Sequence, residues 1–187
     1  PCTPGKFGFE LALTQLMFVI DRSGSMKFRL SGPPAEGTVV PRSEWRWTVF
    51  QNALKKTLPS FDQQIAMGAK FFPEEQTVGD RSRSCLVDQG AGLAPKRGNA
   101  GAIISTFDDT EPVGGTPTSE AIRLASQFLS ASRSVARTIV LATDGAPNCN
   151  NGLDGNSCIC TTNPTSVNPD PCGSQDSSCL DDERTIS

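Results

Sequence analysis

A short apolar run that ends in a carboxylate and two hydroxyls constrains the fold of this chain more than any other feature. Leu16–Ile20 has the sequence Leu-Met-Phe-Val-Ile, and Asp21, Ser23 and Ser25 follow it at alternate positions. An apolar, partly β-branched run of this length is typical of a buried strand in a parallel sheet. In the tight turn after such a strand, alternate residues can direct their oxygens at one point. One carboxylate and two hydroxyls make a hard-oxygen site of low charge, which suits Mg²⁺, Mn²⁺ or Ca²⁺ rather than a soft metal.

Two later segments carry the same kinds of side chain. Gly114–Thr118 has the sequence Gly-Gly-Thr-Pro-Thr, and Ile139–Gly145 is a second apolar run that ends in Thr-Asp-Gly. The patterns Asp-x-Ser-x-Ser, Gly-Gly-Thr-Pro-Thr and Thr-Asp-Gly, in this order, resemble the von Willebrand factor A-type domain and its metal-ion-dependent adhesion site. The resemblance covers nearly the whole chain from about Phe9 onward, judged on the alternation of strands and helices.

The resemblance implies an α/β fold: a doubly wound, mostly parallel central sheet flanked by helices in a Rossmann-like arrangement. The 187 residues fit a single von Willebrand factor A-type domain over residues 1–187. A Cys-rich loop insertion would occupy residues 145–179. The family fold needs further strands and helices, because a strand that ends at Ala142 would otherwise form an open sheet edge. We therefore expect the domain to continue beyond residue 187, or a separate segment to complete the sheet.

Hydrophobic periodicity predicts the elements of this fold. Central strands are expected over Leu16–Asp21, Ile65–Phe72 and Thr138–Ala142, with a short antiparallel edge strand around Gly92–Ala94. A first helix is expected from an N-cap near Ser43, with a core stripe of Trp47, Phe50, Leu54 and Leu58. Further helices are expected over Asn99–Phe107 and Pro117–Leu129. The acidic residues Asp181–Glu183 are expected to form the first turn of another helix.

The resemblance also assigns a metal-binding set. Ser23, Ser25 and Thr116 would offer hydroxyl oxygens directly to the ion, and Asp21 and Asp144 would ligate directly or through bound water. Two carboxylates nearly balance a divalent cation, most simply Mg²⁺, with Mn²⁺ or Ca²⁺ as alternatives. The ion then stays electrophilic, so an Asp or Glu of a partner can displace a water and bind to it. The alternative is that Asp21, Ser23 and Ser25 form only a polar turn that caps a strand.

Cysteine usage indicates an oxidising compartment. The seven cysteines are Cys2, Cys85, Cys149, Cys158, Cys160, Cys172 and Cys179. Five of them lie in a polar segment with few apolar residues, where disulfides are the natural cross-links. Cys158 and Cys160 are too close to bond to each other comfortably, and the odd count leaves one cysteine free or paired outside the chain. A zinc cluster is the alternative, but the sequence has neither Cys-x-x-Cys pairs nor His.

Composition excludes several classes of function. The chain has no stretch of about 18 apolar residues and therefore no predicted transmembrane helix. A net charge of −3 without a basic block disfavours nucleic acid as a partner. The lack of His removes imidazole from any acid–base or triad chemistry. Asn148–Asn156 is rich in Asn and Asp, but it lacks the alternating acids of an EF-hand, and turn chemistry explains it better than Ca²⁺.

The leading hypothesis is a non-enzymatic, metal-dependent adhesion module at a bacterial cell surface, which binds a protein or matrix partner that presents Asp or Glu. Thr143–Cys149 and the Cys-rich sequence after it look like bacterial extracytoplasmic members of the family, some of them lipoproteins. One alternative is a structural subunit whose metal site docks an internal or sister-protein acidic segment. A metal-assisted hydrolase is a weaker alternative, because we find no separate base or nucleophile motif.

Overall fold

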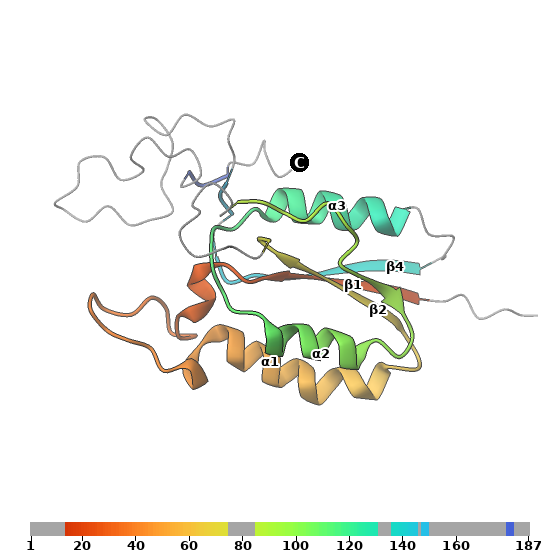
Figure 1. Cartoon of the computed structure of the whole chain (residues 1–187), viewed down its shortest axis with the longest axis horizontal. Helices are drawn as coiled ribbons and strands as arrows, with labels where there is room; N and C mark the ends of the chain where they lie inside the picture. The colour runs from red at the N-terminus through yellow and green to blue at the C-terminus, as the bar shows by residue number, and fades with distance from the viewer. Residues whose placement is uncertain (1–13, 75–84, 131–135, 146, 150–178, 182–187) are drawn as a thin grey trace, which may run out of the picture.

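Four strands form one sheet at the centre of the molecule (Figure 1). The computed structural model describes residues 14–74, 85–130, 136–145, 147–149 and 179–181. β1 (Thr14–Asp21) lies between β2 (Ala66–Phe72) and β4 (Ala136–Ala142), and all three strands run parallel. β3 (Leu93–Lys96) pairs with β2 in the antiparallel sense, so the sheet order is β3-β2-β1-β4. The predicted fold class, a mostly parallel sheet in a Rossmann-like α/β arrangement, is confirmed.

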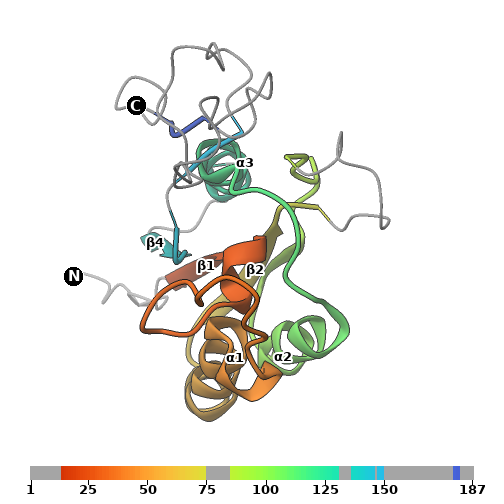
Figure 2. The same ribbon diagram turned by 90° about the vertical axis from the view of Figure 1, so that its left-hand side faces the viewer.

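Helices cover both faces of this sheet. α1 (Arg46–Thr57) and α2 (Ala100–Asp109) lie on one face, and α3 (Thr118–Ser130) lies on the other (Figure 2). Alternate residues of a strand point to opposite faces. Phe18 therefore joins the core under α1 and α2, whereas Val19 joins the core under α3. Burial on both faces explains why the first strand is continuously apolar.

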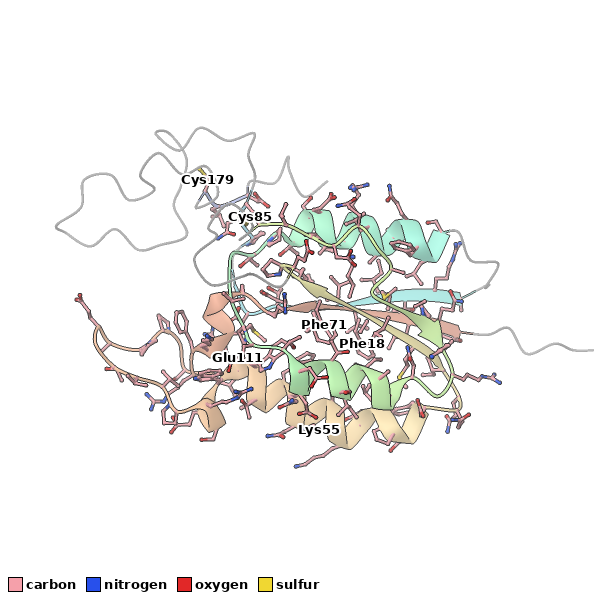
Figure 3. The ribbon with its side chains drawn as sticks, viewed as in Figure 1. Phe18, Lys55, Phe71, Cys85, Glu111 and Cys179 are labelled. Atoms are coloured by element: carbon pink, nitrogen blue, oxygen red, sulfur yellow. A yellow bond between two sulfur atoms is a disulfide. The ribbon has the colours of Figure 1, made fainter. Side chains whose placement is uncertain are left out.

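An aromatic cluster fills the core between the sheet and the first two helices. Trp47 is 1% exposed and packs against Phe107, with ring centroids 4.5 Å apart, and against Phe71 at 6.2 Å. Phe18 and Phe71 extend from the sheet toward the same layer (Figure 3). The prediction that Trp47 is a core residue rather than a ligand platform is thereby confirmed.

The start of α1 corrects one prediction. Ser43 was expected to cap this helix, but it lies in a 3₁₀ turn over Arg42–Glu44, and α1 begins at Arg46. The reason is the backbone of Trp45, which is extended (φ −63°, ψ 141°) and separates the turn from the helix. The indole of Trp45 donates a hydrogen bond to the carbonyl of Val40 at 2.9 Å, which ties the turn back to the preceding loop.

The remaining elements agree with their predicted positions to within a few residues. β3 is the expected antiparallel edge strand. β4 has β1 as its one neighbour among the described residues and leaves Val140 and Leu141 36% and 39% exposed, which is the open edge expected from the sequence. The helix predicted at Asp181–Glu183 falls mostly outside the described residues. Within the described part, no helix combines the length and apolar character needed to cross a bilayer.

Candidate metal centre

Three loops meet at the carboxyl ends of β1 and β4. The two strands are parallel and in register, with Ile20 opposite Ala142, so the residues that follow them emerge at the same edge of the sheet. The loop before α3 joins them through the main chain: the amide of Gly24 donates to the carbonyl of Gly114 at 3.0 Å, and the amide of Val113 donates to the carbonyl of Arg22 at 2.6 Å. The fold therefore brings all three sequence motifs to one place.

Four of the five predicted ligands share one hydrogen-bond network. The hydroxyl oxygens of Ser23 and Ser25 are 2.9 Å apart, and the Ser25 hydroxyl donates to Oδ1 of Asp144 at 2.8 Å. The backbone amide of Ser23 donates to Oδ1 of Asp21 at 2.7 Å. Oδ2 of Asp21 accepts a hydrogen bond from the hydroxyl of Thr143 at 2.7 Å. Ser25 thus directs its hydroxyl at the carboxylate that follows β4, and Ser23 links Asp21 to it through hydrogen bonds.

Asp21 is fully buried, and this burial is the main reason why its pKa is raised above the usual 3.8. The hydrogen bonds from Ser23 and Thr143 act in the opposite direction, and the nearby charge of Asp144 raises the pKa further. None of the described ion pairs involves Asp21. A cation bound beside a buried carboxylate would favour its charged form. The surroundings of Asp21 therefore fit a site that takes up positive charge.

Thr116 is also at the site, but its side chain lies outside the network. It is 5% exposed, and its hydroxyl makes no hydrogen bond within the described part of the chain. Its main chain is held instead by Asn148, whose Oδ1 accepts from the Thr116 amide at 2.7 Å. Thr116 is thus a buried residue whose hydroxyl oxygen has lone pairs to offer to an ion.

The donor set fits a hard divalent cation. It consists of two carboxylates and three hydroxyls, which are the oxygen ligands preferred by Mg²⁺, Mn²⁺ and Ca²⁺. Over the described residues, no group of three or more His, Cys, Asp or Glu side chains is placed to hold a metal. Metal binding through the hydroxyl-rich set stays a prediction.

Arg46 is a member of the site that sequence reasoning missed. Its guanidinium pairs with Oδ2 of Asp144, and its Nε donates to the carbonyl of Arg29 at 3.0 Å. The two paired side chains are only 16% and 9% exposed. Nothing in the sequence marks this arginine, because it stands at the start of α1 and 98 residues from its partner. Its positive charge lies where a metal ion would be attracted.

Arg46→Gln is expected to raise the affinity for Mg²⁺. The guanidinium competes with the ion for Asp144. Even an exposed ion pair is worth up to ~1 kcal/mol, or about fivefold in affinity, and this pair is mostly buried, so a gain of at least about that size is expected. Calorimetric titration of the wild type and of the variant measures the change. Arg42→Gln is the matched control, because Arg42 forms an exposed pair with Glu111. Weaker binding by Arg46→Gln would mean that Arg46 supports the site instead of competing with the ion.

A cavity of about 490 Å³ opens beside Asp144. Arg46, Thr143 and Asp144 supply its polar wall. Its apolar wall is formed by Met26, Leu30, Val49, Phe50, Ala53 and Ala142. The candidate centre therefore borders a surface with both charged and apolar character.

The structure tests the disulfide prediction for three of the seven cysteines. Cys85 and Cys149 form a disulfide that links two segments 64 residues apart, and Cys179 is buried and also disulfide-bonded. The disulfides expected from composition are therefore present, and for these three residues the zinc alternative is excluded. Cys2, Cys158, Cys160 and Cys172 lie outside the described residues, as does most of the predicted Cys-rich insertion at residues 145–179.

No protein-family model and no curated protein matches the chain. Among solved structures, it is similar to a variant of the PilB minor pilin from Streptococcus sanguinis, with a TM-score of 0.55 and 21% identity over 74% of this chain and 31% of the pilin chain. It is also similar to the pilus adhesin SpaC from Lactobacillus rhamnosus GG, with a TM-score of 0.53 and 23% identity over 75% of this chain and 16% of SpaC. The von Willebrand factor domain of the pilus tip protein Mfa5 from Porphyromonas gingivalis aligns over 73% of this chain at a TM-score of 0.47 and 18% identity.

The chain spans about a third or less of the length of PilB and SpaC. Likeness at this level of identity establishes the fold. This chain therefore shares its α/β fold with proteins of bacterial pili.

Proposed function

We propose that this chain is a metal-dependent binding module that attaches a bacterial surface to a protein or matrix partner. The observation that carries the proposal is the single network of Asp21, Ser23, Ser25 and Asp144 at the carboxyl edge of the sheet. The similarity to PilB and SpaC supports an adhesive role outside the cytoplasm. The disulfides support the same location, because they persist in oxidising compartments.

Each residue of the centre has a distinct role in this proposal. Ser23, Ser25 and Thr116 offer neutral oxygens, so that the two carboxylates need only balance the charge of the ion. When bound, a Mg²⁺ ion supplies an electrophilic position for an acidic side chain of the partner. Asp21 stays out of water and holds the turn after β1 through the amide of Ser23.

The cavity beside Asp144 provides a second contact for the partner. A carboxylate directed at the centre would bring the side chains next to it over the apolar wall formed by Met26, Leu30, α1 and the end of β4. Small sites with a few polar groups and an apolar lining are typical of ligand recognition. We therefore expect the partner segment to combine an Asp or Glu with neighbouring apolar residues.

A structural subunit is the second candidate function. The similarity to PilB, a minor pilin, favours it over the hydrolase alternative. In that case, the acidic group would belong to a sister subunit or to another part of the same polypeptide instead of to a host surface. Lipid anchoring, suggested only by resemblance, is part of neither candidate.

Metal-dependent attachment is the test of the proposal. The protein, immobilised on a sensor surface, is passed over collagen, fibronectin, fibrinogen and the surface proteins of its own cell, first with Mg²⁺ and then with EDTA. Binding to at least one of these proteins is expected with Mg²⁺, and its loss is expected with EDTA or in Asp21→Asn. Binding to a sister subunit alone would favour the structural role. Binding that persists in EDTA and in Asp21→Asn would refute the metal-dependent mechanism.

A further inference from the structure

We propose that Asn148, held in place by the Cys85–Cys149 disulfide, positions Thr116 for metal binding. This inference rests on the proposed function, because it assigns a role in the metal centre to residues outside its ligand set. Thr116 needs such support because its hydroxyl makes no hydrogen bond with the described residues. The position of this oxygen therefore depends on how firmly its main chain is held.

Asn148 binds the main chain of Thr116 from both sides. Its carboxamide Oδ1 accepts from the Thr116 amide at 2.7 Å, and its own backbone amide donates to the Thr116 carbonyl at 3.0 Å. Pro117 follows directly and has a ring-restricted φ angle. The peptide groups before and after Thr116 are therefore both fixed, and the direction of its side chain is set by a residue from another loop.

The disulfide forms the surface on which this loop rests. A Cβ atom added at Gly115 would lie 2.5 Å from Sγ of Cys149, 2.9 Å from Oδ1 of Asn148 and 3.4 Å from Sγ of Cys85. Only a residue without a side chain allows the main chain to approach so closely. Sγ of Cys149 is also 3.1 Å from Oδ1 of Asn148, and because a disulfide sulfur carries no proton this is a packing contact. The carboxamide is thus enclosed between the disulfide and the Thr116 amide.

The far end of the disulfide is anchored to the sheet. Cys85 lies beside the loop that precedes α3 (Figure 3) and starts a segment that crosses the α3 side of the sheet. Lys70 of β2 is 1% exposed, and its ammonium donates to the carbonyls of Asp88 at 2.5 Å and Gly90 at 2.7 Å. The amide of Glu74 donates to the carbonyl of Leu86 at 2.6 Å. Asn148 is therefore connected through the disulfide to a segment that is hydrogen-bonded to β2 and to the residues that follow it.

Removal of the carboxamide tests this role. Asn148→Ala is expected to weaken Mg²⁺ and Mn²⁺ binding about tenfold in calorimetric titration, the usual effect of losing an outer partner of a metal ligand. Amide exchange should become faster at Thr116. The melting temperature of the metal-free protein should stay close to that of the wild type. Asn52→Ala is the matched control, because it makes the same deletion at an exposed position of α1.

A double-mutant cycle separates positioning from a general loss of structure. If Asn148 acts through Thr116, the double variant Asn148→Ala, Thr116→Ala will bind metal no more weakly than Thr116→Ala alone. Equal affinities of Asn148→Ala and the wild type would overturn the inference, and so would additive losses in the double variant. A wild type that binds neither ion would instead show that the proposed metal function itself is wrong. The two failures are therefore distinguishable.

Discussion

Replacing Asp21 with asparagine is expected to abolish the binding of Mg²⁺ and Mn²⁺ while leaving the fold intact. Asparagine has nearly the same shape and can keep the contacts with the Ser23 amide and the Thr143 hydroxyl. It removes one of the two negative charges that balance the ion. The loss should be at least about 100-fold, since even outer partners of metal ligands are worth 10- to 100-fold in affinity.

Isothermal titration of the metal-stripped proteins measures this loss. Asn52→Ala should bind like the wild type, and Ser25→Ala should show an intermediate loss, because it removes a neutral ligand that also contacts Asp144. A folded Asp21→Asn protein with wild-type affinity would show that Asp21 is only a strand-end turn residue. That outcome would support the polar-turn alternative left open by the sequence.

The pH dependence of stability provides an independent check on Asp21. Burial raises the pKa of this carboxyl above 3.8, so the folded metal-free protein holds the proton more tightly than the unfolded chain. The resulting stabilisation is complete below pH 3.8 and is lost as the pH rises through the folded-state pKa. Urea denaturation in EDTA should therefore show the stability of the wild type falling relative to that of Asp21→Asn across this window. A difference that stays constant or grows with pH would contradict the assignment.

Replacing both Cys85 and Cys149 with alanine should lower the free energy of unfolding by about 4 kcal/mol, as expected for a cross-link that closes a loop of this length. The two residues are 64 positions apart, so the disulfide greatly restricts the unfolded chain. The same variant should also bind Mg²⁺ more weakly, because Asn148 loses its support.

Urea denaturation in EDTA measures the stability effect separately from metal binding. The double alanine variant is preferable to treatment with a reductant, because a reductant would also attack the disulfide of Cys179. A denaturation midpoint equal to that of the wild type would contradict the expected contribution. A stability loss without any loss of metal affinity would separate the disulfide from the positioning of Thr116.

The parts of the site that could be predicted from sequence are those attached to strand ends. Asp21 and Asp144 each follow an apolar run, and two parallel strands in register bring their carboxyl ends together. Ser23 and Ser25 lie in the turn directly after Asp21, so the end of the same strand positions them. For these residues, local sequence and sheet topology are enough, and the fold class follows from the same pattern.

The parts that could not be predicted depend on contacts between loops. Arg46 pairs with Asp144, which is 98 residues further along the chain, and Asn148 bonds to Thr116, which is 32 residues before it. No periodicity or turn signal in the sequence marks these pairs. Seven cysteines allow many pairings, so spacing could not select Cys85 and Cys149. The start of α1 was misplaced because Ser43 is a good cap by type, whereas the geometry of Trp45 decides where the helix begins.

The bonds that join the loops of the centre are mostly between peptide groups: Gly24 to Gly114, Val113 to Arg22, and Asn148 to Thr116. Peptide groups are present whatever the side chains are, so these bonds tolerate sequence drift except where the close approach needs Gly115 or the carboxamide of Asn148. Side chains at the exposed rim can be exchanged during evolution without disturbing the positions of the oxygens at its centre. A lineage could therefore change the surface it recognises while keeping its chemistry, even when little similarity of sequence is left.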